Sequence, residues 1–174
     1  MIDQRLMLPP DADERAMLDT FLDWHREVLA RKCAGLTDEQ LRRRAVPSSN
    51  LSLLGLMRHL AGVERWYFQA VIADDWRGSL YTATGDADED FNNVAAATGA
   101  ATLALWREQV ERSRRITAER PLDAVGTVPA GGDHPTAGRS YTLRWVLVHM
   151  IDEYARHNGH ADLIREAIDG TAGE

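Results

Sequence analysis

Cysteine is almost absent from this sequence of 174 residues, in which Cys33 is the single one. A lone thiol excludes an intrachain disulfide, and it also excludes the zinc sites that are built from two or more cysteines. Any metal ion must therefore be held by histidine and carboxylate side chains. Cys33 is expected near the C-terminal end of a helix, where the helix dipole does not favour a thiolate, so it is a poor candidate for a catalytic nucleophile.

Long apolar runs and an excess of basic residues are absent as well. No stretch approaches the roughly 18 consecutive apolar residues of a membrane span, and the N-terminal residues do not contain the apolar core of a signal peptide. The 20 basic and 27 acidic residues give a net charge of −7, which argues against nucleic acid and anionic lipid as partners. These absences predict a cytoplasmic protein that binds neither a membrane nor nucleic acid.

The chain also lacks internal repeats and low-complexity segments, which excludes a solenoid. Its length lies within the range of about 100–200 residues that is usual for one domain. We therefore predict a single domain over residues 1–174.

Apolar residues recur at helical spacing in four long segments, and no segment shows a convincing strand pattern. This pattern predicts an all-α fold, a four-helix bundle, although periodicity does not decide between antiparallel neighbours and a crossover. The segment 121–140 is rich in Gly and Pro, and we expect it to be a lid-like loop. The expected helices span about 13–32, 51–73, 89–119 and 141–168, with a short additional helix at 37–40.

An acidic run, Asp86-x-Asp88-x-Asp90, invites a calcium-binding interpretation. An EF-hand loop needs Gly at its sixth position and Glu at its twelfth, where this sequence has Phe91 and Ala97. We therefore reject calcium and interpret the run as a solvated surface or as a helix N-terminus, which the helix dipole favours.

The last expected helix carries polar residues among its apolar ones. Four of them fall within one stripe roughly 80° wide, because successive residues of a helix turn by about 100°. They are His149, Glu153, His157 and His160. His149 and His157 are about 12 Å apart along the helix axis, so one ion can be shared only by neighbours three or four positions apart. The possible pairs are 149/153, 153/157 and 157/160.

Helical phase ranks these pairs. The centre of the apolar stripe on this helix passes through His157, and Glu153 lies about 40° from it, His160 about 60° and His149 about 80°. The pair 153/157 is therefore the most inward. A carboxylate and an imidazole buried together need charge compensation and hydrogen bonds, and a divalent cation provides the compensation and takes the place of those bonds.

A third metal ligand must come from another helix, and His59 suits this role. It falls between Leu56 and Leu60 on the inner face of the second long helix, whereas Arg58 points outward. Two histidines and one glutamate leave a coordination position open, which is typical of a catalytic zinc site. The alternative for each residue is a hydrogen-bonded polar group without a metal, and we favour that interpretation for His25.

The segments 56–66 (LMRHLAGVERW) and 145–162 (WVLVHMIDEYARHNGHAD) resemble those of the DinB-like superfamily, in the branch related to mycothiol-dependent enzymes. Members of this superfamily are four-helix bundles, commonly dimeric, that hold one divalent metal. The resemblance implies that His59, Glu153 and His157 are the metal ligands. Many members have two histidines four residues apart on the last helix, and the Glu153/His157 pair looks instead like that of mycothiol-dependent maleylpyruvate isomerase.

The resemblance further implies a metal-dependent thiol S-transferase, in preference to an isomerase, that conjugates mycothiol to small electrophiles in detoxification or stress response. The alternative is a non-catalytic binding or regulatory protein that contains a metal. Zinc is the expected metal, although the same ligands suit nickel, iron or manganese. A homodimer is expected, and His149, Arg156 and His160 are candidates for contacts with the substrates.

Overall fold

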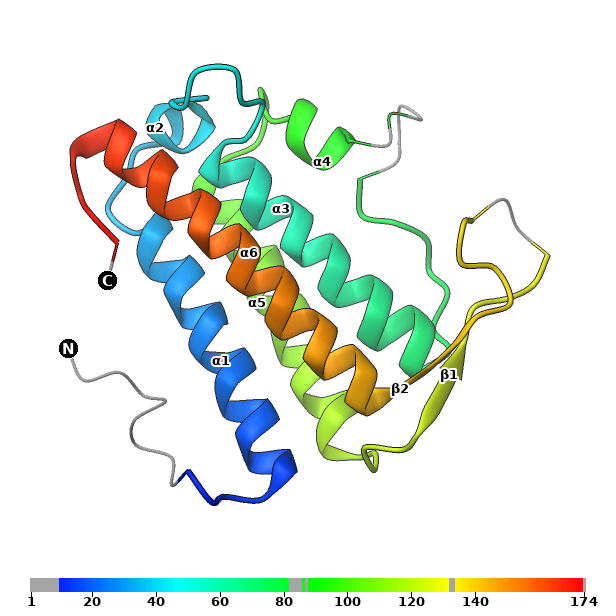
Figure 1. Ribbon diagram of the computed structural model, residues 1–174. Helices are drawn as coiled ribbons and strands as arrows, with labels where there is room; N and C mark the ends of the chain where they lie inside the picture. Colours follow the sequence, from blue (N-terminus) through cyan, green and yellow to red (C-terminus); the bar gives the residue numbers. More distant parts are fainter. Residues whose placement is uncertain (1–9, 82–85, 87, 132–133, 174) are drawn as a thin grey trace.

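Four long helices form a bundle in the computed structural model, which describes residues 10–81, 86, 88–131 and 134–173 (Figure 1). The prediction of an all-α bundle is confirmed. No helix in the described part of the chain is long and apolar enough to cross a membrane. The bundle consists of α1 (Glu14–Cys33), α3 (Leu53–Glu64) with its continuation as a π-helix, η2 (Arg65–Ile72), α5 (Gly99–Ala118) and α6 (Leu143–Asp169).

The route of the chain places α6 beside α1, with both helices running in the same direction. At the start of α6, the side chain of Arg144 binds Glu14 at the start of α1, with 2.7 Å between Nε and Oε1. Near the end of α6, Arg165 donates to the backbone carbonyl of Lys32 at the end of α1. From the end of η2 the chain returns along the bundle before α5 begins (Figure 1), so the connection between α3 and α5 is a crossover.

The crossover contains an independent short helix, α4 (Glu89–Asn92). The prediction of a single helix over 89–119 is therefore wrong, because residues 93–98 separate α4 from α5. The start of α5 is fixed by a second short helix, α2 (Asp38–Arg42). Asp38 accepts a hydrogen bond from the backbone N–H of Gly99, and a Cβ at Gly99 would lie only 2.4 Å from Leu41.

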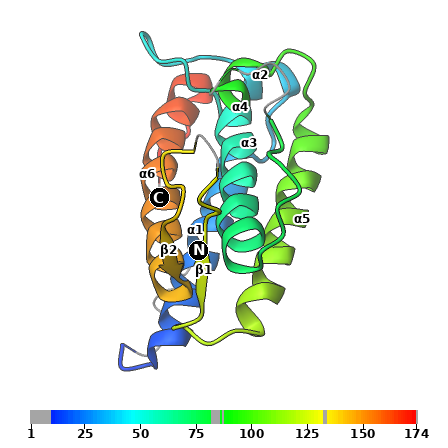
Figure 2. The same cartoon turned by 90° about the vertical axis from the view of Figure 1, so that its right-hand side faces the viewer.

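Two short strands interrupt the segment that was expected to be a loop, and the prediction that the chain contains no strand is wrong. β1 (Val125–Thr127) pairs antiparallel with β2 (Ser140–Thr142). The hairpin lies beside η2, between α6 and α3 (Figure 2). A Cβ at Gly126 would lie 2.0 Å from the carbonyl oxygen of Val71, so only glycine allows this approach of β1 to η2.

The bundle core contains a buried polar network in addition to its leucines. Arg26 of α1 makes a two-pronged ion pair with Glu64 of α3, with both nitrogen–oxygen distances at 2.8 Å. The Tyr154 hydroxyl donates to Glu64 and accepts from the Trp106 indole. Each charged or polar atom in this network has a partner, which is the condition for burying such groups without a large cost.

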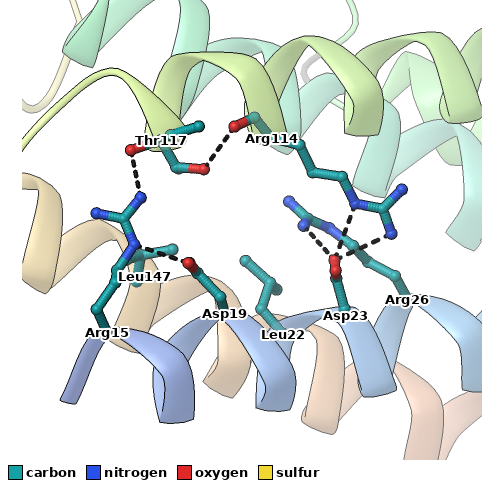
Figure 3. Close-up of a pocket in the computed structure, with 9 residues that line it drawn as sticks. Arg15, Asp19, Leu22, Asp23, Arg26, Arg114, Thr117 and Leu147 are labelled. Carbon is teal, nitrogen blue, oxygen red and sulfur yellow. Dashed lines mark hydrogen bonds and ion pairs between the residues drawn. The ribbon is translucent and has the colours of Figure 1, made fainter. Parts of the chain in front are cut away.

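The seam between α1 and α5 holds a separate cavity of about 140 Å³ (Figure 3). Asp23 accepts hydrogen bonds from Arg26 and Arg114, and Arg15 binds both Asp19 and the backbone carbonyl of Thr117. The opposite charges around this cavity therefore bind one another, and we do not assign a ligand to it.

Candidate metal centre

His59 lies at the edge of the buried face of α3. The side chain of Ser52 accepts a hydrogen bond from the backbone N–H of Gly55 and thereby caps the start of this helix. Leu56 and Leu60 on either side of His59 are fully buried. The His59 side chain itself retains 21% exposure. Its imidazole can therefore be anchored in the protein and still be reached from outside.

Glu153 and His157 lie one turn apart on α6 and face His59. Glu153 Oε1 is 3.0 Å from His59 Nε2 and 3.2 Å from His157 Nε2. One ligand atom from each of the three residues can be chosen so that all lie within 4.8 Å of one another. The structure thus brings together the three residues that helical phase and the family resemblance singled out.

Asp90 is a member of this site that the sequence analysis missed. It lies in the first turn of α4, and its Oδ2 atom is 2.7 Å from His59 Nδ1, on the opposite edge of the ring from Glu153. The neighbouring Phe91 stacks on the His59 ring with centroids 4.7 Å apart. The sequence interpretation of the acidic run as a helix N-terminus holds for α4, but nothing in the sequence pairs Asp90 with a residue 31 positions earlier.

α4 is held firmly against α3 at this point. The Arg58 side chain donates to the backbone carbonyl of Asp90 at 2.9 Å. Gly55 leaves room for Phe91, since a Cβ there would lie 3.3 Å from its Cα. The position of Asp90 beside His59 is therefore determined by packing as well as by its own hydrogen bond.

The three candidates for substrate contacts lie in different surroundings. His160 Nδ1 is 3.3 Å from His157 Nδ1, so His160 supports a candidate ligand. Arg156 is exposed and binds Asp152 at 2.7 Å. His149 stacks on Trp145, with centroids 4.9 Å apart, and meets the Tyr67 ring at 4.7 Å.

Electrostatics favour a charged pair at the centre when no metal is bound. Burial of the His59 imidazole opposes its protonation, but hydrogen bonds to Asp90 and Glu153 outweigh burial and raise the His59 pKa to about 9. Hydrogen bonds from His157 and His59 hold the pKa of Glu153 well below its ordinary value. The carboxylate is thus ionised at neutral pH, as a metal ligand must be.

The residues present fit a divalent cation. Two imidazole Nε2 atoms and one carboxylate oxygen converge, and this donor set suits zinc and other first-row metals. The remaining Nδ1 atoms of His59 and His157 already face Asp90 and His160, which is the outer support that metal-binding histidines usually have. Three protein ligands leave a position open.

A cavity of about 200 Å³ opens beside the centre, between α3 with η2 on one side and the crossover on the other. His59 and Asp90 form part of its wall. Its other large side chains are the aromatic rings of Trp66, Tyr67 and Tyr81. A small molecule in this cavity would lie directly beside the candidate ligand His59.

His25, the tryptophans Trp24, Trp106 and Trp145, and Cys33 do not contribute ligand atoms to this centre. Asn158 donates to the backbone carbonyl of His25, between α1 and α6. Among the tryptophans, Trp24 and Trp106 are buried in the core, whereas Trp145 is 44% exposed. Cys33 is buried, and burial raises the pKa of its thiol to about 12, which is unsuitable for a nucleophile.

Comparison with known proteins gives a family match over most of the chain. Residues 17–170 match the family model described as mycothiol S-transferase. No curated protein matches. A solved structure, described as the conserved protein of locus from Enterococcus faecalis, has 17% sequence identity and a TM-score of 0.60, and the match covers 92% of this chain and 99% of the other. At this identity the structural match concerns the fold alone.

Proposed function

Because the chain belongs to the mycothiol S-transferase family, we propose that it conjugates mycothiol to small electrophiles at the centre formed by His59, Glu153 and His157. The observation that carries this proposal is the convergence of two imidazoles and a carboxylate beside an aromatic cavity. Zinc is the metal that we propose, in a cytoplasmic, homodimeric protein that forms one domain over residues 1–174 and serves detoxification or stress response.

The chemistry follows from the donor set. His59, Glu153 and His157 would hold a divalent cation, whose chemistry when bound would be to lower the pKa of a thiol so that the sulfur is available as thiolate at neutral pH. Asp90 holds the His59 ring, and His160 supports the His157 ring. When an alkyl halide reacts, the sulfur–carbon bond forms as the carbon–halogen bond breaks, and the thiol proton and the halide leave as the acid.

The protein itself supplies no nucleophile in this scheme. The single cysteine is buried on α1, and burial disfavours its thiolate. An external thiol therefore has to provide the reactive sulfur, which agrees with the family match.

Elemental analysis combined with a transferase assay tests this proposal. We expect one bound metal ion per chain in the wild type, and loss of that ion in His59→Ala, Glu153→Ala and His157→Ala, because each change removes one of three ligands. His25→Ala is the matched control, since it removes a histidine outside the centre. Unchanged metal content in all three variants would refute the centre.

The assay uses zinc-loaded protein, mycothiol and a haloarene, and it also includes other low-molecular-weight thiols. We expect the wild type to exceed His59→Ala by several orders of magnitude. Stoichiometric binding of the thiol without product would instead support the alternative of a non-catalytic, metal-containing binding or regulatory protein.

A further inference from the structure

Among the described residues that line the cavity beside the candidate metal centre, Asp90 is acidic and none is an arginine or lysine. Asp90 contributes a carboxylate to the cavity wall, and Glu153 lies behind His59. Two guanidinium groups lie behind the wall. That of Arg58 lies over the Tyr81 ring at 4.0 Å and is hydrogen-bonded to the Asp90 backbone. That of Arg156 is bound to Asp152 at 2.7 Å and lies 3.9 Å from Glu153 Oε2.

An anionic substrate would lack a partner in this cavity. The two carboxylates of Asp90 and Glu153 already balance a divalent cation, and a thiolate adds one more negative charge. A carboxylate on the electrophile would therefore be desolvated beside like charges, and this is costly because none of the described lining residues is an arginine or lysine that could bind it directly. The cavity thus favours electrophiles without charge.

The wall of the cavity also offers hydrogen-bond donors. Tyr67 lies on η2, and its ring is held by three neighbours at centroid distances of 4.7 Å from His149, 5.9 Å from Trp145 and 6.2 Å from Tyr141. Its hydroxyl makes no hydrogen bond within the described part of the chain. Burial, Tyr141 and the Glu153 carboxylate all raise the Tyr67 pKa, so the phenol keeps its proton at neutral pH.

Tyr67 is therefore a rigid, neutral donor in the wall that also contains His59. Tyr81 is a second phenol in this wall, but the guanidinium of Arg58 covers its ring, and it belongs to the crossover and not to a long helix. A ring that packs against three neighbouring rings loses little freedom when it binds a ligand, so its hydrogen bond contributes more of its strength to binding.

We propose that this cavity selects uncharged electrophiles that carry a carbonyl-type acceptor, and that Tyr67 donates the hydrogen bond which holds this acceptor. The proposal rests on the proposed transferase function and names its substrate class. With iodoacetamide, the sulfur–carbon bond forms as the carbon–iodine bond breaks, and iodide leaves with the electron pair. The amide oxygen accepts a hydrogen bond from Tyr67, which retains its proton throughout.

A pair of matched electrophiles tests the charge selection. Iodoacetamide and iodoacetate share the reacting carbon and the leaving group and differ in charge. We expect the zinc-loaded wild type to prefer iodoacetamide by at least about tenfold in kcat/KM, after each rate is divided by the uncatalysed rate with mycothiol. Equal preference for the two would overturn the selection of uncharged substrates while leaving the transferase function intact.

The role of Tyr67 is tested by removal of a single hydroxyl. Tyr67→Phe should lower kcat/KM for iodoacetamide by about 3- to 10-fold, as expected for one neutral hydrogen bond, without loss of zinc. Tyr141→Phe is the matched control, because Tyr141 belongs to the same ring cluster but does not line the cavity. The assignment to Tyr67 would be overturned if kcat/KM for iodoacetamide stayed unchanged in Tyr67→Phe. It would also be overturned if this value fell in Tyr81→Phe and not in Tyr67→Phe.

A binding measurement separates this inference from the proposed function. N-Phenylsuccinimide is an uncharged imide that does not react with thiols, and its ring-opened form, N-phenylsuccinamate, carries a carboxylate. In the zinc-loaded protein, quenching of tryptophan fluorescence should show tighter binding of the imide, weakened about 3- to 10-fold by Tyr67→Phe. If no thiol is transferred but this binding pattern holds, the transferase proposal fails and the cavity assignment stands. Equal binding of the two probes would overturn the cavity assignment.

Discussion

Asp90 Oδ2 lies 2.7 Å from His59 Nδ1, while the Nε2 atom of the same ring faces Glu153 at 3.0 Å. A carboxylate from the crossover thus fixes the orientation of a side chain on α3. This hydrogen bond also makes the imidazole a stronger electron donor toward a metal.

Replacement of Asp90 by asparagine should lower the affinity for Zn²⁺ by about 10- to 100-fold, because the outer partner of a metal-binding histidine is weakened. Competition with a chromogenic chelator measures this affinity. Asp88→Asn is the matched control, since Asp88 is exposed on the same acidic run. Equal affinities in the two variants would show that Asp90 does not support the centre.

The metal-free protein should lose stability as the pH rises from about 6.5 to about 9. The His59 pKa is raised from 6.5 to about 9, so the stabilising charge on this ring is fully present below pH 6.5 and is lost as the pH rises through about 9. The Glu153 pKa is lowered from 4.5, so its contribution is present above that pH and is lost as the pH falls. Melting temperatures in excess chelator measure the decline.

The stabilisation that zinc adds to the protein should increase as the pH rises, in contrast to the stability of the metal-free protein. Metal binding requires a neutral imidazole, so the stabilisation by zinc increases over the interval in which His59 loses its proton. The difference between zinc-loaded and metal-free melting temperatures should therefore grow with pH. His59→Gln should abolish this growth, and a difference that stays constant in the wild type would contradict the assigned pKa.

Replacement of Glu64 by leucine should destabilise the fold by about 3–5 kcal/mol, because the buried Arg26 would lose its partner. Urea unfolding monitored by circular dichroism gives the free energy. Glu111→Leu, at an exposed position on α5, should change it by less than about 0.5 kcal/mol. The double variant Arg26→Met, Glu64→Leu should regain most of the lost free energy of unfolding. If it does not, the destabilisation by Glu64→Leu does not come from the broken ion pair.

Gly126→Ala should lower the free energy of unfolding by about 1–3 kcal/mol, since the new methyl group would overlap the Val71 carbonyl. Gly131→Ala is a suitable control on the same hairpin, where a Cβ has open space around it. If both variants unfold alike, the contact between β1 and η2 is looser than the structure indicates.

The sequence predicted the parts of this molecule that depend on periodicity. Glu153 and His157 were ranked together because a four-residue spacing on one apolar face has a single geometric outcome in a helix. The inner-face position of His59 followed in the same way. These features are local, so they can be derived without knowledge of the tertiary contacts.

The features that were missed depend on contacts between distant segments. The start of α5 at Gly99 is packed against Leu41 of α2, where a side chain would collide, and β1 depends on the approach of Gly126 to Val71. Strands of three residues are also too short to show an alternating pattern. Asp90 was missed for the same reason, because its role exists only after the crossover has brought α4 onto α3.

The order of the helices along the chain determines when the residues of the candidate centre come together. His59 and Asp90 precede α5, whereas Glu153 and His157 lie on α6, which the ribosome produces after the other helices. The three ligands come together only once α6 has docked beside α1 and α3. A metal ion bound at the proposed centre would therefore be captured only when the bundle is complete, and it would hold in place the helix of the bundle that is synthesised after the other three.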